Sequence, residues 1–298
     1  MKRIFAALTV AFALFSVLCG CEGNRGGTDA PFSSENTAEK EPPAAAWKAH
    51  FLNVGKADAI LLEADGLFYL IDTGTKESFP VLQKAFETFS VTELQSVFIT
   101  HTDKDHIGGL SDLLGESGVA VGSVCAPAVG VFDGDGKDKV DKKAEKYGFS
   151  VTRLPVGEQI PVGKNGLYLE VLAPVRAAEG ENNNSLVMKL RGGASTALFT
   201  GDAQFFEEYD LLERDISADV LKVAHHGSDE ASSYSFLKAV GAKIAVISTS
   251  TAEREETPSP TVLSALDGLG AKVYVTQDAA LCVTVTSDGN GALNAVLR

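Results

Sequence analysis

The residues with the most distinct chemistry lie just after an apolar, β-branched run, Val97 to Thr100. Four possible metal ligands follow within six positions: His101, Asp103, Asp105 and His106. Imidazole and carboxylate groups bind Zn²⁺, and carboxylates also suit harder divalent ions such as Mn²⁺. The run is typical of a buried strand, and a loop at a strand end can direct several side chains into one space. The pattern therefore predicts a hydrolytic metal centre.

The alternative is a polar turn that caps the strand, with Asp105 or His106 as the N-cap of the helix that follows. The distribution of histidines favours the metal centre. The chain has five histidines, and four of them lie in two clusters, the one above and the adjacent pair His225 and His226. The fifth, His50, lies in an alternating, strand-like stretch, so we expect it to be structural.

The segment from His101 to Gly109, H-T-D-K-D-H-I-G-G, resembles the H-x-[HD]-x-D-H-x-G-G pattern of the metallo-β-lactamase fold. The form with Asp in the third position is similar to that of the hydrolase domain of ComEC-type competence proteins and their stand-alone relatives. Other matches follow in the family's order: residues 51–59 resemble F-L-D-V-G-Q-G-D-A, 71–74 I-D-T-G, 182–187 N-x-x-S-L-V, 199–202 the G-D motif, and 221–228 L-K-V-x-H-H-G-S. The resemblance spans roughly residues 47–286.

The resemblance implies an α/β fold, an αββα sandwich in a single domain with its site at one edge of the sheets. The roughly 250 residues from position 47 onward suit one such domain with a large core. We expect strands near 47–53, 57–64, 67–72, 97–100, 121–126, 150–155, 167–173, 185–191, 195–200, 219–224 and 244–248, followed by closing strands. We expect helices near 77–89, 108–115, 136–147, 203–213, 232–240 and 259–268.

The resemblance also implies a binuclear centre with two divalent ions, Zn²⁺ or Mn²⁺. Its ligands would be His101 and Asp103 on one ion, Asp105 and His106 on the other, Asp202 between the two, and His225 or His226 on the second ion. Two ions about 3.5–4 Å apart can activate a bridging water and stabilise both oxygens of an in-line phosphoryl displacement. That chemistry needs no protein nucleophile.

The two adjacent histidines are expected to act differently, because successive residues at a strand end point in different directions. We expect His225 to bind the metal and His226 to bond a phosphate oxygen or protonate the leaving group. The reverse assignment is the alternative. Asp105 and His226 are thus the candidate catalytic residues beside the ions.

Four further polar residues are expected around the site. Asp58 and Asp72 are candidates for outer carboxylates that orient the histidines or the metal loop. Asn184 and Ser185 occupy the place where other members of the fold carry a third histidine. They could bond the substrate or supply a weak oxygen ligand.

The chain departs from the family pattern at several positions. Asn53, Lys56 and Ala57 replace the usual Asp, Gln and Gly of the opening motif, and Ser259 precedes Pro260 where relatives often carry His-Pro. A carboxylate and a substrate-contacting group are thereby lost. Reduced or altered activity is therefore an alternative to full activity.

The first 21 residues are predicted to be a lipoprotein signal peptide. Lys2 and Arg3 precede an apolar run, residues 4–18, that is too short for a permanent membrane span. Residues 18–21, L-C-G-C, resemble a bacterial lipobox with Cys21 as the lipidated residue. An ordinary secretory signal is the alternative, and both place the protein outside the cytoplasm.

Residues 22–46 are rich in Gly, Ser, Thr, Asn, Glu and Pro and are predicted to be a flexible linker. Residues 47–298 would then form the hydrolase domain. No transmembrane helix is expected after the linker, so we expect attachment to a bacterial membrane through the lipid alone, and no channel. Cys125 and Cys282 are expected to be separately buried thiols, with a disulfide as the alternative.

The formal net charge is −14. An acidic domain repels phosphate backbones at long range, whereas proteins that bind duplex nucleic acid usually have the opposite balance. Bound ions would neutralise part of this charge. The charge favours small or single-stranded phosphate substrates and leaves nucleic acid among the candidates.

Three functions remain open from the sequence. The first is a phosphodiesterase or nuclease, the second another hydrolase such as a lactonase or β-lactamase, and the third a binding module without catalysis. No histidine occurs between His106 and His225, which argues against the three-histidine zinc site of a β-lactamase. The complete set of candidate ligands argues against a binding module.

Overall fold

The computed structural model describes residues 45–298. The predicted leader, with Cys21, and nearly all of the predicted linker lie outside the described residues. The first strand, β1, spans Trp47–Leu52. Among the described residues, no helix combines the length and the apolar character needed to cross a membrane.

The first sheet has eight strands in the order β17-β16-β1-β2-β3-β5-β7-β8. Neighbours from β17 to β3 pair antiparallel, and those from β3 to β8 pair parallel. Their bounds after β1 are β2 (Ile60–Ala64), β3 (Leu67–Ile71), β5 (Ser96–Phe98), β7 (Val124–Pro127), β8 (Val151–Leu154), β16 (Cys282–Ser287) and β17 (Leu293–Leu297).

The second sheet has seven strands in the order β15-β14-β13-β12-β11-β10-β9. It also changes from antiparallel pairs, between β9 and β12, to parallel pairs, between β12 and β15. The bounds are β9 (Gln159–Val162), β10 (Leu167–Ala173), β11 (Val187–Arg191), β12 (Ala197–Phe199), β13 (Val220–Lys222), β14 (Ile244–Ile247) and β15 (Lys272–Val275). A small ladder joins β4 (Glu93–Leu94) to β6 (Ala120–Val121).

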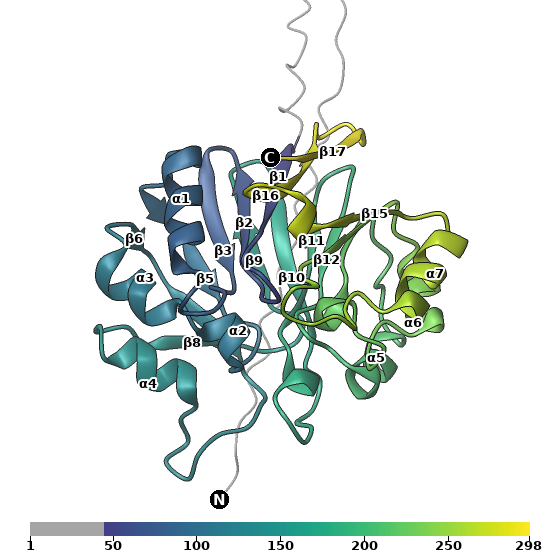
Figure 1. Cartoon of the computed structure of the whole chain (residues 1–298). Helices are drawn as coiled ribbons and strands as arrows, with labels where there is room; N and C mark the ends of the chain where they lie inside the picture. The colour runs from purple at the N-terminus through teal and green to yellow at the C-terminus, as the bar shows by residue number, and fades with distance from the viewer. Residues whose placement is uncertain (1–44) are drawn as a thin grey trace, which may run out of the picture. The chain divides into compact units, whose positions relative to one another are not determined.

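Helices flank the two sheets on opposite sides (Figure 1). Those beside the first sheet are α1 (Phe79–Phe89), α2 (Lys104–Ile107), α3 (Leu110–Glu116) and α4 (Lys139–Glu145); those beside the second are α5 (Phe205–Leu211), α6 (Tyr234–Val240) and α7 (Pro260–Gly268). One buried core joins residues of both sheets, including Phe51 and Phe199. Each sheet also forms one further core with its own helices. The predicted αββα sandwich is confirmed.

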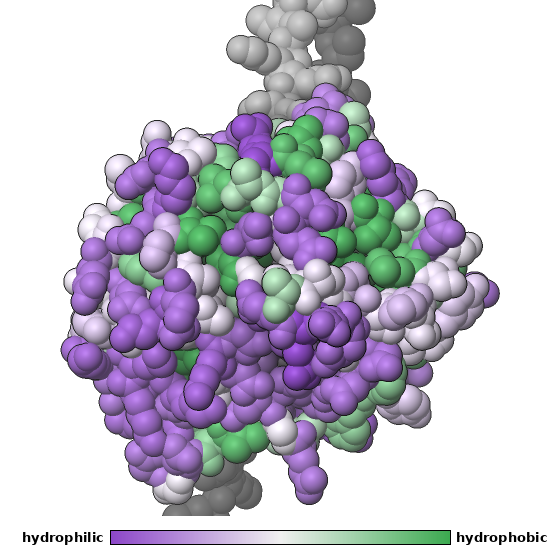
Figure 2. Space-filling view, in the orientation of Figure 1, coloured by the Kyte–Doolittle hydropathy of each residue, from purple (hydrophilic) through white to green (hydrophobic). Residues whose placement is uncertain are grey.

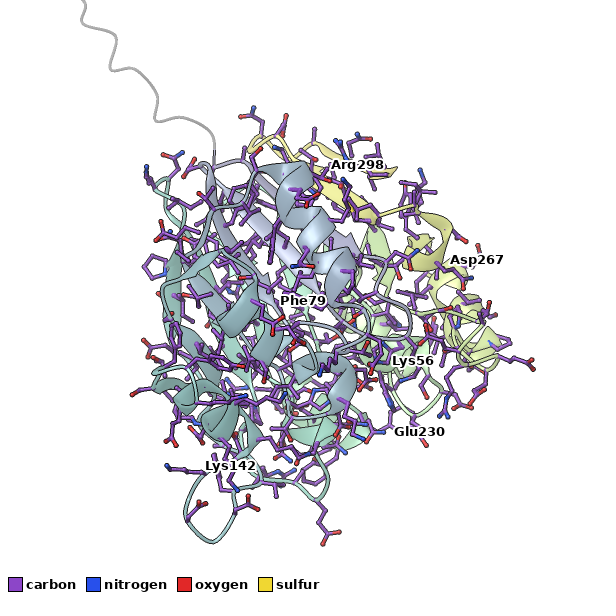
Figure 3. The ribbon with its side chains drawn as sticks, turned by 60° about the vertical axis from the view of Figure 1, so that its left-hand side comes forward. Lys56, Phe79, Lys142, Glu230, Asp267 and Arg298 are labelled. Carbon is purple, nitrogen blue, oxygen red and sulfur yellow. The ribbon has the colours of Figure 1, made fainter. Side chains whose placement is uncertain are left out.

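Helix α1 shows how the sequence determines one of these layers. Pro80 lies in its first turn, where its missing N–H costs nothing, and Ser90 ends it in a left-handed conformation. Ala85 and Phe86 lie three and four positions after Leu82, on the same face of the helix, and all three are buried. Figure 3 shows α1, with Phe79 at its start, lying over the strands of the first sheet.

Most predicted elements are present with slightly shorter bounds, and several short elements were not predicted. Strand β9 contains Pro161 and lies at a sheet edge, where proline is tolerated. Helix α2 has four residues, too few to show a helical period. The predicted strand 219–224 ends at Lys222 and is followed by a short helical turn, η2 (Ala224–Gly227).

The two sheets are arranged so that functional loops meet at one edge. The carboxyl ends of parallel strands lie at the same edge of a sheet, and ligand sites commonly form there. Strand β5 runs into the segment 101–106, β12 runs into Asp202, and β13 runs into η2. Around α2, the face of the molecule shown in Figure 2 is largely hydrophilic.

Candidate metal centre

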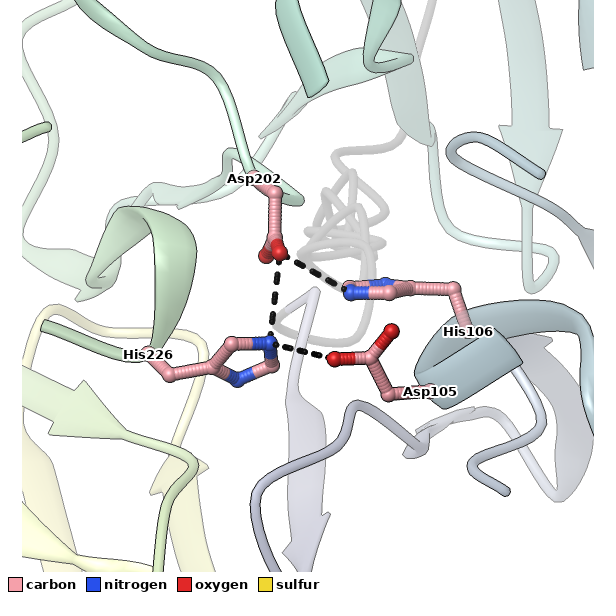
Figure 4. Close-up of side chains that lie close together, drawn as sticks. All are labelled: Asp105, His106, Asp202 and His226. Atoms are coloured by element: carbon pink, nitrogen blue, oxygen red, sulfur yellow. Dashed lines mark ion pairs between the residues drawn. The ribbon is translucent and has the colours of Figure 1, made fainter. Parts of the chain in front are cut away.

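Side chains from three segments that follow strands of the two sheets converge at this edge (Figure 4). Asp105 and His106 lie on α2 after β5, Asp202 follows β12, and His226 lies on η2 after β13. One ligand atom from each of the four residues lies within 4.8 Å of every other. Residues more than a hundred positions apart thus form one cluster, which we call the central cluster.

The distances within the central cluster fit one metal ion. His106 Nε2 and His226 Nε2 each lie 3.2 Å from Asp202 Oδ2, and His226 Nε2 lies 3.4 Å from Asp105 Oδ2. Two ligand atoms at about 2.0–2.1 Å from a tetrahedral ion are about 3.3 Å apart. The observed separations therefore fit ligands that share an ion, and they also fit direct ion pairs between imidazole and carboxylate.

Several atoms of this cluster are buried without a hydrogen-bond partner. They are Nε2 of His106, Nε2 of His226 and Oδ1 of Asp202, and Nε2 of the neighbouring His101 is in the same state. Buried polar atoms in native proteins are nearly always paired. Because ligand atoms of His106, His226 and Asp202 converge and several of their buried polar atoms have no hydrogen-bond partner, the residues present fit a divalent cation.

The outward-facing ring nitrogens fix the orientation of both central histidines. His106 Nδ1 donates to Asp72 Oδ2 at 2.8 Å, and His226 Nδ1 donates to the carbonyl of Ser248 at 2.9 Å. Such bonds leave Nε2 as the nitrogen that can bind a metal. Asp72 also accepts from the backbone N–H and the hydroxyl of Thr100, at 2.7 Å each. Asp72 therefore links the ring of His106 to Thr100 at the end of the β5 segment.

The Gly-Gly pair after the ligands has a packing role. A Cβ atom on Gly108 would lie 2.6 Å from the backbone nitrogen of Lys76, closer than real Cβ atoms approach backbone. Thr73 N donates to the carbonyl of His106 at 2.7 Å. The segment from His101 to Gly109 thus packs directly on the loop that carries Asp72.

The adjacent histidines lie in a left-handed turn. His225 has φ 49° and His226 has φ 56°, and Gly227 continues at 77°. Non-glycine residues in this region cost free energy and persist where their surroundings hold them. Here His225 N donates to the carbonyl of Gly201, and Ser259 N donates to the carbonyl of Gly227. The turn directs the two side chains to different places.

This turn reverses the predicted assignment of the pair. His226 is fully buried and belongs to the central cluster, whereas the His225 side chain is 14% exposed and its Nε2 lies 3.9 Å from Asp202 Oδ2. The prediction assumed an extended strand end up to residue 224. Because the backbone instead turns left-handed at both residues, the second histidine faces inward and the first lies at the rim.

His225 is surrounded by polar side chains at the rim. Its Nε2 lies 3.4 Å from Asn182 Nδ2, its Nδ1 lies 3.4 Å from Gln204 Nε2, and Nδ1 is also 3.8 Å from Glu230 Oε2. Burial lowers the pKa of His225, against the attraction of Asp202. An imidazole at this place can exchange hydrogen bonds with a substrate.

His101 and Asp103 form a second group beside the central cluster. Their Nε2 and Oδ2 atoms are 3.8 Å apart, and the rings of His101 and His106 are 4.1 Å apart. Ser185 Oγ lies 3.5 Å from His101 Nδ1 and accepts from the backbone N–H of Asp202 at 3.1 Å. This pair does not belong to the group of four residues whose ligand atoms converge.

Asn184 and Ser185 have positions different from those predicted. The Asn184 amide is used by the backbone of Ala178 and Gly180, so it holds a loop and offers nothing to a substrate. Ser185 contacts His101 and Asp202 from behind, which makes it an orienting residue. The position in sequence suggested a substrate role, but the directions of these side chains contradict it.

Asp58 belongs to a buried ion pair that was not predicted. Its Oδ2 lies 2.6 Å from Lys222 Nζ, and its carboxylate lies 3.9 Å from His106 Nδ1 and 4.0 Å from His226 Nδ1. Lys222 Nζ also donates to the carbonyl of Val223 at 3.0 Å. Lys222 lies three positions before the H-H-G motif, but its role in the ion pair depends on Asp58, 164 positions away in sequence.

Charges in the cluster depend on each other. Burial disfavours the imidazolium form of His106, but Asp202 and Asp72 outweigh it and raise the pKa of His106 well above its usual range. The pKa of His226 is also raised, because Asp202 and Asp105 outweigh its burial. A metal ion must displace these protons, so metal affinity depends on pH.

The two cysteines within residues 45–298 do not take part in the site. Cys125 and Cys282 are both buried and free, as the alternating apolar strands predicted. Burial raises the pKa of each thiol. Neither is therefore a ready nucleophile.

Comparison with known proteins gives a family match over most of the described chain. The family model "Metallo-beta-lactamase superfamily" matches residues 52–251, about two thirds of the chain. That range includes every residue of the central cluster and of its orienting partners. It also includes the H-H-G motif and all of the opening motif except Phe51.

Two curated proteins illustrate the similarity in sequence. ComE operon protein 3 of Bacillus subtilis is 29% identical over 189 residues, which cover 62% of this chain and 24% of that protein. Competence protein ComA of Neisseria gonorrhoeae is 26% identical over 250 residues, which cover 82% of this chain and 32% of that protein. The chain thus spans about a quarter to a third of the length of these relatives.

A solved structure shows the same fold. The diiron β-hydroxylase CmlA of Streptomyces venezuelae superposes with a TM-score of 0.51 at 13% identity, covering 76% of this chain and 52% of that one. Its E377D mutant gives a TM-score of 0.53 at the same identity, covering 79% and 53%. At this identity the likeness concerns the fold alone.

Proposed function

The chain belongs to the metallo-β-lactamase superfamily of metal-dependent hydrolases, and from that premise we propose that it hydrolyses phosphodiesters, as a phosphodiesterase or nuclease with two divalent ions. One observation carries the proposal: ligand atoms of two aspartates and two histidines converge around Asp202, and Nε2 of both histidines and Oδ1 of Asp202 are buried without a hydrogen-bond partner. Bound divalent ions would supply Lewis acidity and neutralise the charge of a phosphoryl group.

The ligands divide into two groups that share Asp202. The central cluster, with Asp105, His106 and His226, would hold one ion, and His101 with Asp103 would hold the other. Imidazole and carboxylate together suit both Zn²⁺ and Mn²⁺. No third imidazole adjoins His101 in the described residues, and Ser185 lies there instead. This composition supports phosphoryl chemistry over the three-histidine zinc site of β-lactamases.

The rim residues would act on the substrate directly. His225 is partly exposed, and its ring nitrogens face Asn182 and Gln204. From this position an imidazole can donate a hydrogen bond to a phosphoryl oxygen or a proton to a leaving oxygen. The side chain of His226 is fully enclosed and cannot take that part.

The acidic charge and the relatives bear on the class of substrate. A net charge of −14 disfavours long duplexes, so we propose small phosphodiesters or single-stranded nucleic acid. The similarity to Competence protein ComA supports keeping nucleic acid among the candidates.

The test combines metal analysis with a substrate panel. The purified domain, loaded with Zn²⁺ or Mn²⁺, should hold close to two ions and hydrolyse at least one phosphodiester or single-stranded oligonucleotide. Lactones and β-lactams serve as comparison substrates. If the loaded protein hydrolysed those and no phosphodiester, the proposed substrate class would be wrong. If it bound metal and hydrolysed nothing, it would be a binding module.

We also propose an extracytoplasmic location with a lipid on Cys21 as the only membrane attachment. The support is the short apolar run before L-C-G-C and the polar segment after it. In a bacterial host, the full chain should partition with membranes and Cys21→Ser should not. Equal partitioning of both would contradict the lipid anchor.

A further inference from the structure

Lys56 lies at the open side of an otherwise enclosed cluster. Its Nζ is 3.2 Å from Asp105 Oδ2, the same oxygen that His226 Nε2 approaches. The side chains of His106, His226 and Asp202 are at most 3% exposed, whereas those of Asp105 and Lys56 are 26% and 17% exposed. A solute that reaches the cluster from this side therefore meets the lysine ammonium group beside Asp105.

The position of Lys56 is fixed by the backbone that carries it. The N–H of Lys56 donates to Glu253 Oε2 at 3.2 Å, and Asp58 N donates to the carbonyl of Asp105 at 3.1 Å. Gly55 has φ +81°, and a Cβ atom there would lie 2.2 Å from Glu253 Oε1. The short loop after β1 is thus held between α2 and the segment around Glu253. Figure 3 shows Lys56 on the same side of the molecule as Glu230.

Lys56 and His225 each lie beside a carboxylate of the central cluster. Lys56 Nζ is 3.2 Å from Asp105 Oδ2, and His225 Nε2 is 3.9 Å from Asp202 Oδ2. Glu230 lies on the other side of His225, 3.8 Å from its Nδ1. In an acidic protein, a fixed cation beside the site attracts an anion at short range.

We propose that Lys56 is a specificity-determining residue that binds an anionic oxygen of the substrate, and that it gives this chain a preference for negatively charged phosphate esters over neutral esters. When a substrate phosphate enters, the ammonium group can bond its oxygen while it stays within reach of Asp105. The inference rests on the proposed function. It deepens that function by assigning charge selection to a residue outside the ligand set.

The position also gives the proposal a second, opposite consequence. A lysine 3.2 Å from a ligand carboxylate opposes the binding of a cation by that carboxylate. Removing its charge should therefore preserve or strengthen metal retention while it weakens anion binding. If Lys56 only stabilised the fold, its removal would weaken metal retention and anion binding together.

The experiment compares metal-loaded wild type, Lys56→Gln, Lys56→Arg and the control Lys84→Gln. The control makes the same change of charge and also breaks a lysine–carboxylate contact, Lys84 Nζ to Glu87 Oε2 at 3.3 Å, on α1 outside the site. Affinity for inorganic phosphate, retention of metal against a chelator, and kcat/KM for an anionic phosphodiester and a neutral phosphotriester are measured for each variant.

Lys56→Gln should lower the affinity for inorganic phosphate and kcat/KM for the anionic ester by about 10-fold to 100-fold, as expected for one lost charge-assisted hydrogen bond. The neutral ester should change less than about threefold on the same scale. Metal retention should be equal or tighter, Lys56→Arg should keep most of the phosphate affinity, and Lys84→Gln should match wild type.

Two results would overturn the role of Lys56. One is unchanged phosphate affinity in Lys56→Gln, and the other is a joint loss of metal and phosphate. If wild type bound metal and phosphate but hydrolysed no phosphodiester, the proposed function would fail while the phosphate measurements still decided the role of Lys56.

Discussion

Two buried histidine environments in this protein look similar at first and differ in what they can bind. His50 on β1 is 1% exposed, its Nδ1 lies 2.9 Å from Thr284 Oγ1, and its ring stacks on Phe89 at 3.9 Å. His106 is equally buried, and its Nδ1 is bonded to Asp72. Both rings leave a buried Nε2 without a hydrogen-bond partner.

The difference lies in what surrounds the unpartnered nitrogen. His50 Nε2 faces one carboxylate, Glu63 at 3.6 Å, and that carboxylate is already bonded to Lys48 at 2.9 Å. His106 Nε2 lies 3.2 Å from Asp202, which a second imidazole also approaches at 3.2 Å. An orphan nitrogen alone is therefore weak evidence for a metal. Convergence of several orphan atoms is the informative feature.

The largest expected effect follows from removing the carboxylate that both proposed ions share. Asp202→Ala should lower the affinity for divalent metal by more than about 100-fold, beyond the 10–100-fold typical of an outer partner. Phosphodiester turnover should fall with it. The control variant His50→Gln, which changes the other histidine environment, should bind metal as tightly as wild type. Elemental analysis and chelator competition measure both variants, and full metal content in Asp202→Ala would break the comparison.

The second expected effect separates the two adjacent histidines. His226→Ala should lose metal because its Nε2 belongs to the central cluster. His225→Ala should keep metal and lower turnover, by about 10²–10⁴-fold if it is the general acid. A nitrophenolate leaving group needs less protonation, so this variant should be partly rescued on a nitrophenyl ester.

The histidine pair also provides a clear contradicting outcome. If His225→Ala lost metal and His226→Ala retained it, the sequence-based assignment would be restored and the geometric one would fail. Measuring metal content before activity keeps these two outcomes apart.

The sequence predicted the layers and the candidate ligands because both are recorded in short, contiguous patterns. The apolar spacing of α1 and the segment from His101 to His106 need no knowledge of distant residues. The sandwich follows from two strand-rich halves with helices, and the site follows from polar residues at strand ends. Local patterns of this kind are the part of a structure that a sequence reveals directly.

The rest depended on backbone conformation and on long-range pairs. The left-handed turn at His225 and His226 reversed the expected roles, and nothing in the residue types H-H-G specifies which imidazole faces inward. Lys222 and Lys56 find their carboxylates 164 and 49 positions away. Asn184 has a suitable side chain but faces a loop, so its predicted substrate role was wrong.

The smallest expected effect concerns stability against pH, and it has opposite signs in the two environments. Burial lowers the pKa of His50 below its ordinary value of 6.5, so the folded protein disfavours the proton that the unfolded chain binds. The contribution of His50 to stability is therefore present above pH 6.5 and is lost as pH falls. The pKa of His226 is raised in the metal-free protein by Asp202 and Asp105, against burial. Its contribution is present below 6.5 and is lost as pH rises.

Denaturant unfolding of the metal-free domain between about pH 5 and 8, the range in which histidine titrates, would measure this difference. The free energy of unfolding of wild type minus that of His50→Gln should increase with pH, whereas wild type minus His226→Gln should decrease. At the most favourable pH each difference should be about 0.5–1.5 kcal/mol, the usual net value of one buried hydrogen bond. The same slope for both variants would mean that the carboxylates around His226 do not hold its proton. The electrostatic difference between the two environments would then be wrong, even if the metal ligands were right.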